Sequence, residues 1–124
     1  GSKPDKPIRT RVFENSAIQE CVVFKDTGHV LAFACVKVDR DLIAISARLI
    51  HRRQLLEGGY VGSQSQCDLD YVLVEHLHRD NFKIALIPGT KEILLLTGLN
   101  LWHFRFSFEE FDADVEEVAS FEFQ

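Results

Sequence analysis

The residues best suited to chemistry in this chain are Asp26-Thr27-Gly28, which stand between two apolar segments near its start. A carboxylate on such a loop can activate a water molecule when a second carboxylate shares its proton. The same three residues also suit a tight turn, because Asp bonds its own backbone and Gly tolerates a positive φ. The flanking segments, 21–24 and 30–36, are rich in β-forming residues and predict a hairpin. We favour the turn, and Asp26 is a catalytic residue only under the alternative interpretation as an enzyme.

Metal-binding and nucleophilic side chains are scattered along the sequence. His76 and His78 fall on one side of a predicted strand, but a third ligand at suitable spacing does not accompany them. His29, His51 and Cys67 lie in segments that the sequence does not relate to one another, and zinc sites need three or four ligands. A nucleophilic Cys would also need a nearby His, which the sequence does not supply for Cys67. We therefore expect no metal, no cofactor and no catalysis.

Composition describes an ordinary globular chain of 124 residues with 46% hydrophobic and 27% charged residues. Residues 1–10 resemble a tag remnant and a flexible lead-in, and residues 11–124 are predicted to form one domain. The net charge of −5 argues against a nucleic-acid partner. The sequence has neither an apolar run of membrane-spanning length nor a signal peptide, so membrane insertion is not expected. Three cysteines without a CxxC spacing favour a reducing, cytoplasmic compartment.

The charges are distributed unevenly along the chain. All 14 Lys and Arg residues lie at or before Arg105, whereas the last sixteen residues contain seven acids and no basic residue. We interpret this acidic end as the exposed side of a C-terminal helix, which is either a solubilising face or a docking surface for a basic partner. The residues predicted to form the docking surface are Glu109, Glu110, Glu116 and Glu117.

The predicted elements position these residues within an α+β domain. After the hairpin, the apolar stripe of residues 39–57 predicts a long helix that ends at Gly58-Gly59. A Gly-rich loop follows, and then three strands joined by short turns. The strands are 69–77, 82–87 and 92–97. Residues 100–108 fit both a strand and a helix, and a helix is predicted from residue 112 onward. The expected architecture is a five-stranded antiparallel sheet with a long central helix and a C-terminal helix.

This order of elements resembles the roadblock (dynein light chain) family and its profilin-like and longin-like relatives. The matching segments are a strand–turn–strand unit, a small-residue-rich helix and three late strands, found here at residues 22–32, 44–49, 71–75, 83–88 and 93–97. The resemblance implies a non-catalytic scaffold that forms homodimers or heterodimers. It also implies partners such as a small GTPase or a subunit of a motor or lysosomal complex. The residues that would pair the two copies are Leu42, Ile45, Leu49, Tyr71 and Leu73.

A second resemblance is to the retropepsin-like aspartic proteases. It rests on Asp26-Thr27-Gly28, on residues 57–62 as a Gly-rich flap and on residues 93–101 as an apolar-Gly segment. It implies a homodimeric protease in which each copy contributes Asp26. Lys25 and His29 depart from the family pattern on either side of the motif. We therefore expect a dimerising scaffold or adaptor, with the protease as the alternative.

Overall fold

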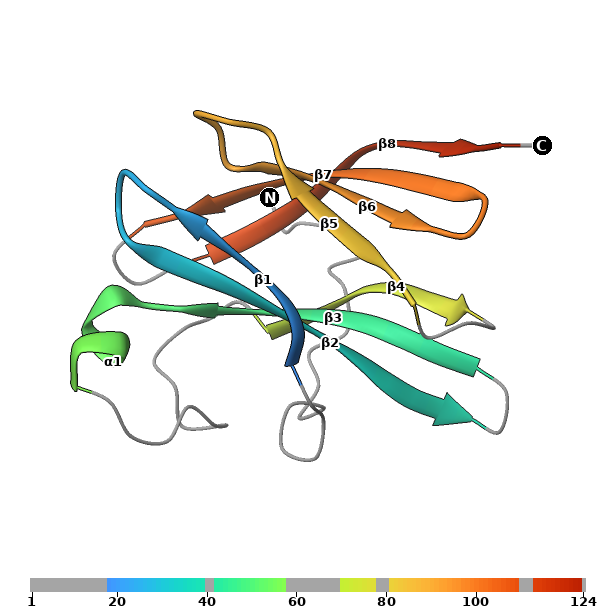
Figure 1. The fold of residues 1–124 in the computed structure, drawn as a ribbon, viewed down its shortest axis with the longest axis horizontal. Helices are drawn as coiled ribbons and strands as arrows, with labels where there is room; N and C mark the ends of the chain where they lie inside the picture. The colour runs from blue at the N-terminus through green and yellow to red at the C-terminus, as the bar shows by residue number, and fades with distance from the viewer. Residues whose placement is uncertain (1–17, 40–41, 58–69, 78–80, 110–112, 124) are drawn as a thin grey trace, which may run out of the picture.

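The computed structural model describes residues 18–39, 42–57, 70–77, 81–109 and 113–123, which contain eight strands and one short helix (Figure 1). In chain order the elements are β1 (Ile18–Phe24), β2 (His29–Asp39), β3 (Leu42–Ile50), α1 (Arg52–Glu57), β4 (Asp70–Leu77), β5 (Lys83–Leu86), β6 (Glu92–Thr97), β7 (Asn100–Phe108) and β8 (Ala113–Glu122). The predicted lead-in at 1–10 and the Gly-rich loop at 58–68, with Cys67, lie outside the described residues, as do His78 and Glu110.

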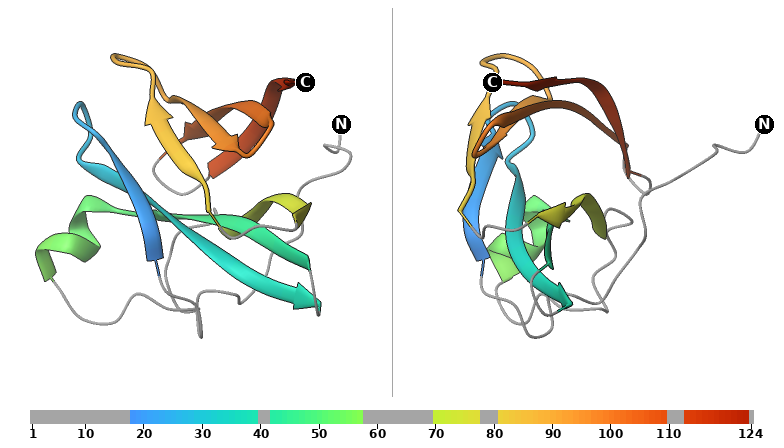
Figure 2. Two further views of the ribbon diagram at one scale, coloured as in Figure 1. Left: turned by 45° about the vertical axis from the view of Figure 1, so that its right-hand side comes forward. Right: turned by 90° about the vertical axis from the view of Figure 1, so that its right-hand side faces the viewer.

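The strands form two antiparallel sheets that pack as two layers (Figures 1 and 2). The first sheet has the order β1-β2-β3-β4, and the second sheet has the order β5-β6-β7-β8. Each sheet is a meander in which consecutive strands are neighbours. The two sheets come together along β1 and β5, which run side by side in both figures. The architecture is therefore all-β, with sheets that face each other across one core.

Two of the predicted hairpins are confirmed. The β1–β2 turn contains Asp26-Thr27-Gly28, and the Gly28 amide donates a hydrogen bond of 2.7 Å to the Phe24 carbonyl. Gly28 has a φ of 79°, which a residue with a Cβ adopts only with strain. The β5–β6 turn contains Pro88-Gly89-Thr90, as its turn-forming residues predict.

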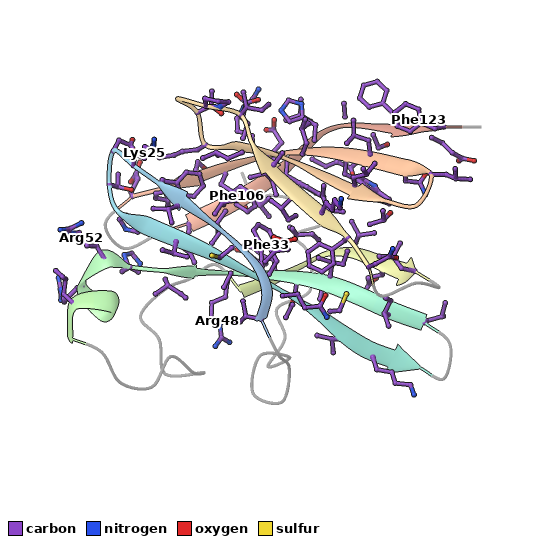
Figure 3. The ribbon with its side chains drawn as sticks, in the orientation of Figure 1. Lys25, Phe33, Arg48, Arg52, Phe106 and Phe123 are labelled. Atoms are coloured by element: carbon purple, nitrogen blue, oxygen red, sulfur yellow. The ribbon has the colours of Figure 1, made fainter. Side chains whose placement is uncertain are left out.

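The core lies between the two sheets and follows from the alternation of side chains along each strand. Leu31 and Phe33 of β2 face Ile93, Phe104 and Phe106 from the second sheet, and all five are almost fully buried. Figure 3 shows Phe33 and Phe106 in the space between the layers. Each sheet thus contributes one apolar face, which is how a two-layer β domain removes its large side chains from water.

The predicted central helix over 39–57 is wrong. Residues 42–50 form β3, and only the six residues of α1 are helical. β3 pairs with β2 on one side and β4 on the other, and both of its faces are buried from Ala44 to Ile50. Because such a strand needs no polar face, its apolar residues do not alternate, and their spacing imitates a helical stripe.

The predicted C-terminal helix is also wrong. Residues 100–108 are the strand β7, so the alternation of Trp102, Phe104 and Phe106 was the informative pattern. β8 follows and pairs with β7 along its whole length, with one extra residue at Val118. Glu and Ala favour helices locally, but cross-strand pairing with β7 outweighs that preference.

These two differences overturn the predicted fold class. The α+β domain with five strands is replaced by two sheets of four strands, and the α+β fold implied by the roadblock resemblance is not the fold of this chain. The expected β4–β5 hairpin is wrong as well, because β4 pairs with β3 and β5 begins the second sheet. Within the described ranges, none of the helical structure is long and apolar enough to cross a membrane.

Candidate functional site

Asp26 lies on the exposed turn between β1 and β2. Its Oδ2 atom accepts a hydrogen bond of 2.9 Å from Lys91 Nζ, which comes from the turn before β6. This hydrogen bond is the largest of the effects that lower the pKa of Asp26 below its ordinary value. In a catalytic carboxylate dyad the shared proton raises the pKa of one carboxyl group instead. The surroundings of Asp26 are therefore those of a surface ion pair that ties the β1–β2 turn to the second sheet.

The residues predicted to pair two copies of the chain lie mostly in the core. Ile45 and Leu49 on β3 and Tyr71 on β4 are almost fully buried. Leu42 is half-buried at the start of β3, and Leu73 packs against the core. The resemblance implied that Leu42, Ile45 and Leu49 lie on a helix and that Tyr71 and Leu73 lie on an adjoining strand, which together would pair two copies. In the β structure a partner could reach the three buried ones only by separating the sheets.

The acidic residues do not share one helical face. Glu109 is exposed just after β7, and Glu110 lies outside the described residues. Glu116 and Glu117 are exposed neighbours on β8, where successive side chains point to opposite sides. Glu116 stands opposite Arg105 and accepts a 3.1 Å hydrogen bond from it, whereas Glu117 stands opposite Phe104. Only part of the predicted acidic surface is therefore available as unneutralised charge.

The structure brings together two histidines that the sequence left unrelated. Val30 of β2 pairs with Ile50 of β3, and His29 and His51 are the residues next to this pair. The His29 Nε2 and His51 Nδ1 atoms lie 3.0 Å apart. His29 Nδ1 is buried without a hydrogen-bond partner, which favours the tautomer that donates from Nε2 to His51. Burial and then His51 are the largest effects that lower the pKa of His29. No group of three or more metal-ligating side chains occurs in the described ranges.

The most distinctive surface is on the outer face of the second sheet, which points away from the core. Leu96, Leu101 and Phe121 stand in register across β6, β7 and β8. Leu99 and Phe123 extend this row, because the Phe123 amide donates a 2.6 Å hydrogen bond to the Leu99 carbonyl. We call these five residues the apolar outer cluster.

The apolar outer cluster is exposed to solvent. The exposed fractions are 40% for Leu96, 62% for Leu99, 54% for Phe121 and 52% for Phe123, and Leu101 is half-buried. Figure 3 shows the Phe123 side chain on the side of the second sheet that faces away from the first. Outward positions of a sheet with one solvated face are normally polar, so a contiguous apolar group there needs a separate explanation.

A row of charged and polar side chains borders the cluster farther along the same face. His103 Nε2 lies 2.7 Å from Glu92 Oε1, and Arg105 contacts both Glu92 at 3.7 Å and Glu116 at 3.1 Å. These four residues satisfy one another across β6, β7 and β8. The outer face therefore has an apolar end next to a polar region, and protein interfaces likewise combine apolar and polar areas.

The sequence contained a signal for this cluster that the helical interpretation concealed. A helix over residues 100–108 would place Leu101 and Phe104 on the same side, because residues three apart are neighbours on a helix surface. Once residues 100–108 are a strand, Leu101 points away from Phe104, and Phe121 follows it in register.

Comparison with known proteins identified no relative, since no family model, curated protein or solved structure matches this chain.

Proposed function

We propose that this chain is a non-catalytic protein-binding domain and that the apolar outer cluster is the centre of its binding surface. The observation that carries the proposal is the row of five leucines and phenylalanines on the outer face of the second sheet, four of which are exposed. Exposed apolar groups with a polar border mark interaction sites in soluble proteins. The proposal keeps the expected role as an interaction domain but moves its surface from β3 and β4 to β6, β7 and β8.

The cost of leaving these side chains in water supports this interpretation. Burial of a large apolar side chain contributes roughly 1.5–3 kcal/mol of free energy. Phe121 and Phe123 are both exposed, and aromatic residues are the class of side chain that dominates interface energies. Neither side chain contributes to the core between the sheets. A partner that covers the outer face would recover this free energy.

The net charge of the chain indicates which class of molecule the partner belongs to. A net charge of −5 disfavours nucleic acid, so the proposed partner is a protein, either a second copy or another chain. The small GTPase and the motor or lysosomal subunits came with the α+β family resemblance and are not carried over. The exposed thiol of Cys21 is compatible with the reducing, cytoplasmic setting that we include in the proposal.

Site-specific photo-crosslinking tests the proposal directly. Benzoylphenylalanine is placed at position 121 in the apolar outer cluster or, as a matched control, at position 23. Val23 is a control because it is an exposed apolar residue on β1, 49% accessible and outside the cluster. We expect a discrete crosslinked protein from position 121 in cells and none from position 23. Equal crosslinking from both positions, or none from position 121, would contradict the proposed surface.

A further inference from the structure

The last strand, β8, forms one edge of the second sheet. Among the described residues β7 is its only neighbour in the sheet, so the other side of β8 presents backbone groups that a further strand can pair with. The part next to the apolar outer cluster runs from Glu117 to the end of β8 at Glu122 and on to Phe123, and we call it the β8 edge. Extended peptides commonly bind by adding a strand to such an edge.

Beyond the extra residue at Val118, the side chains of the β8 edge alternate in chemistry as well as in direction. Phe121 and Phe123 lie on the outer face with the cluster. Ser120 and Glu122 point to the other face of the sheet and pair across the strands with Trp102 and Asn100. Glu117 is on that same face, because it pairs with the inward-facing Phe104. Both glutamates are exposed. One face of the edge thus presents Phe121 and Phe123, whereas the other face presents the carboxylates of Glu117 and Glu122.

The charge of β8 determines which kind of strand can pair with it. Its ten residues include four acids and no base: Asp114, Glu116, Glu117 and Glu122. Arg105 neutralises Glu116, but the described ion pairs do not involve Glu117 or Glu122. Two copies of β8 placed edge to edge would bring like charges together, which is unfavourable. The edge therefore disfavours self-pairing and attracts a basic segment.

We propose that the β8 edge binds an extended segment of a partner protein in which basic residues alternate with apolar residues. The inference rests on the proposed function and specifies how the partner engages the same surface. The apolar residues of the segment lie beside Phe121 and Phe123, and its Lys or Arg residues lie beside Glu117 and Glu122. Backbone pairing with β8 supplies affinity, and this alternation supplies specificity.

The test uses two synthetic ten-residue peptides, one alternating Arg with Val and the other alternating Glu with Val. Binding of each labelled peptide to the full chain is measured by fluorescence anisotropy at low and at physiological salt. We expect the Arg peptide to bind at least tenfold more tightly than the Glu peptide and to weaken as salt increases. The double variant Glu117→Lys/Glu122→Lys should reverse this preference, while the control Glu20→Lys on β1 should not.

Amide hydrogen exchange locates the bound peptide on the unsubstituted chain and so requires no variant. Protection of β8 amides by the Arg peptide supports the inference, whereas protection confined to another edge, such as β4, overturns it. A peptide that binds equally well after the double charge reversal also overturns it. If position 121 crosslinks to a partner but neither peptide binds, the partner covers the sheet face-on. In that case the strand-addition inference fails and the proposed function stands.

Discussion

The two sheets differ in how their faces are used. In the first sheet, β3 is buried on both sides, so that Ala44, Ser46 and Arg48 are as inaccessible as Ile45 and Leu49. In the second sheet, residues alternate along β6 between the core and the outer face. A strand that is covered on both faces can only support the fold, whereas a sheet with one open apolar face has surface left for a partner.

The same contrast appears at the level of neighbouring residues. Leu95 and Leu96 are adjacent on β6, but Leu95 is fully buried in the core and Leu96 is 40% exposed in the apolar outer cluster. The two leucines have the same intrinsic propensity for a β-strand and differ only in the face of the sheet on which they lie. Substitutions on β3 and on the two faces of β6 can therefore separate the supporting role from the binding role.

The largest effect is expected from Leu49→Asp in the first sheet. Leu49 is fully buried on β3, so the new carboxyl group would lie among apolar side chains without a partner. We expect a loss in unfolding free energy on the order of 4 kcal/mol or more, or outright failure to fold. Chemical denaturation monitored by circular dichroism measures this loss. A stable variant would mean that β3 is accessible and would remove the contrast between the sheets.

A smaller effect should separate the two faces of β6. Leu95→Ala removes buried contacts and should lower the unfolding free energy by about 2–5 kcal/mol. Leu96→Ala acts on the solvent side and should change it by less than about 0.5 kcal/mol. The same denaturation experiment compares the two variants. Equal losses would indicate that the outer face is packed within the monomer.

The two tight turns offer a comparison of intermediate size. Gly28 and Gly89 have similar positive φ angles, 79° and 77°, so an Ala at either position costs about 1 kcal/mol in backbone strain. A Cβ at Gly28 would also lie 2.8 Å from Arg52 Nη1, whereas nothing lies within 4 Å at Gly89. We expect Gly28→Ala to lower the thermal midpoint more than Gly89→Ala. Equal shifts would show that Arg52 moves aside at no cost, and the reverse order would contradict the prediction.

A pH-dependent effect should come from the first sheet and its histidine pair. The pKa of His29 is lowered in the folded state, so the unfolded chain binds a proton at higher pH than the folded chain does. The stability contributed by neutral His29 is therefore complete above the ordinary pKa of 6.5 and is lost as pH falls below it. We expect His29→Gln to flatten the dependence of the thermal midpoint between about pH 5 and pH 7. His103→Gln on the second sheet is the control, and an equal flattening there would contradict the assignment to His29.

The smallest expected effect belongs to Asp26. Its pKa is lowered mainly by the hydrogen bond from Lys91, so its favourable contribution is present above the ordinary pKa of 3.8 and is lost as pH falls below that value. Because Asp26 and Lys91 form an exposed ion pair, Asp26→Asn should leave the fold intact. Comparison of thermal midpoints should show a slight difference from wild type at pH 7 that becomes smaller at pH 3. A severe loss of stability would mean that this carboxylate has a structural role beyond the turn.

Local turn chemistry made part of the fold predictable from the sequence. The β1–β2 and β5–β6 hairpins were found because Gly28 and Pro88-Gly89 are specific turn residues between β-forming runs. β3 was missed because burial of both faces removes the alternation that identifies a strand. β8 was missed because its acidic and alanine residues favour a helix until β7 is available as a partner.

The candidate site was less predictable than the fold, because it depends on the register in which the strands pair. The apolar outer cluster depends on the register of β6, β7 and β8, which relates Leu96 to Phe121 across the sheet. The contact between His29 and His51 likewise depends on the register of β2 and β3. A one-residue change in register would move every such side chain to the other face, and local sequence does not specify that register.

The most direct test of the central claim is the affinity of two matched variants for the protein that crosslinks to position 121. Phe121→Ser removes a phenylalanine from the apolar outer cluster, and Val23→Ser removes an exposed apolar side chain of the first sheet. We predict that Phe121→Ser weakens binding at least tenfold while its unfolding free energy stays within about 0.5 kcal/mol of wild type. Val23→Ser should bind like wild type. Equal affinities for the two variants, with both folded, would contradict the claim that the outer face of the second sheet is the binding surface.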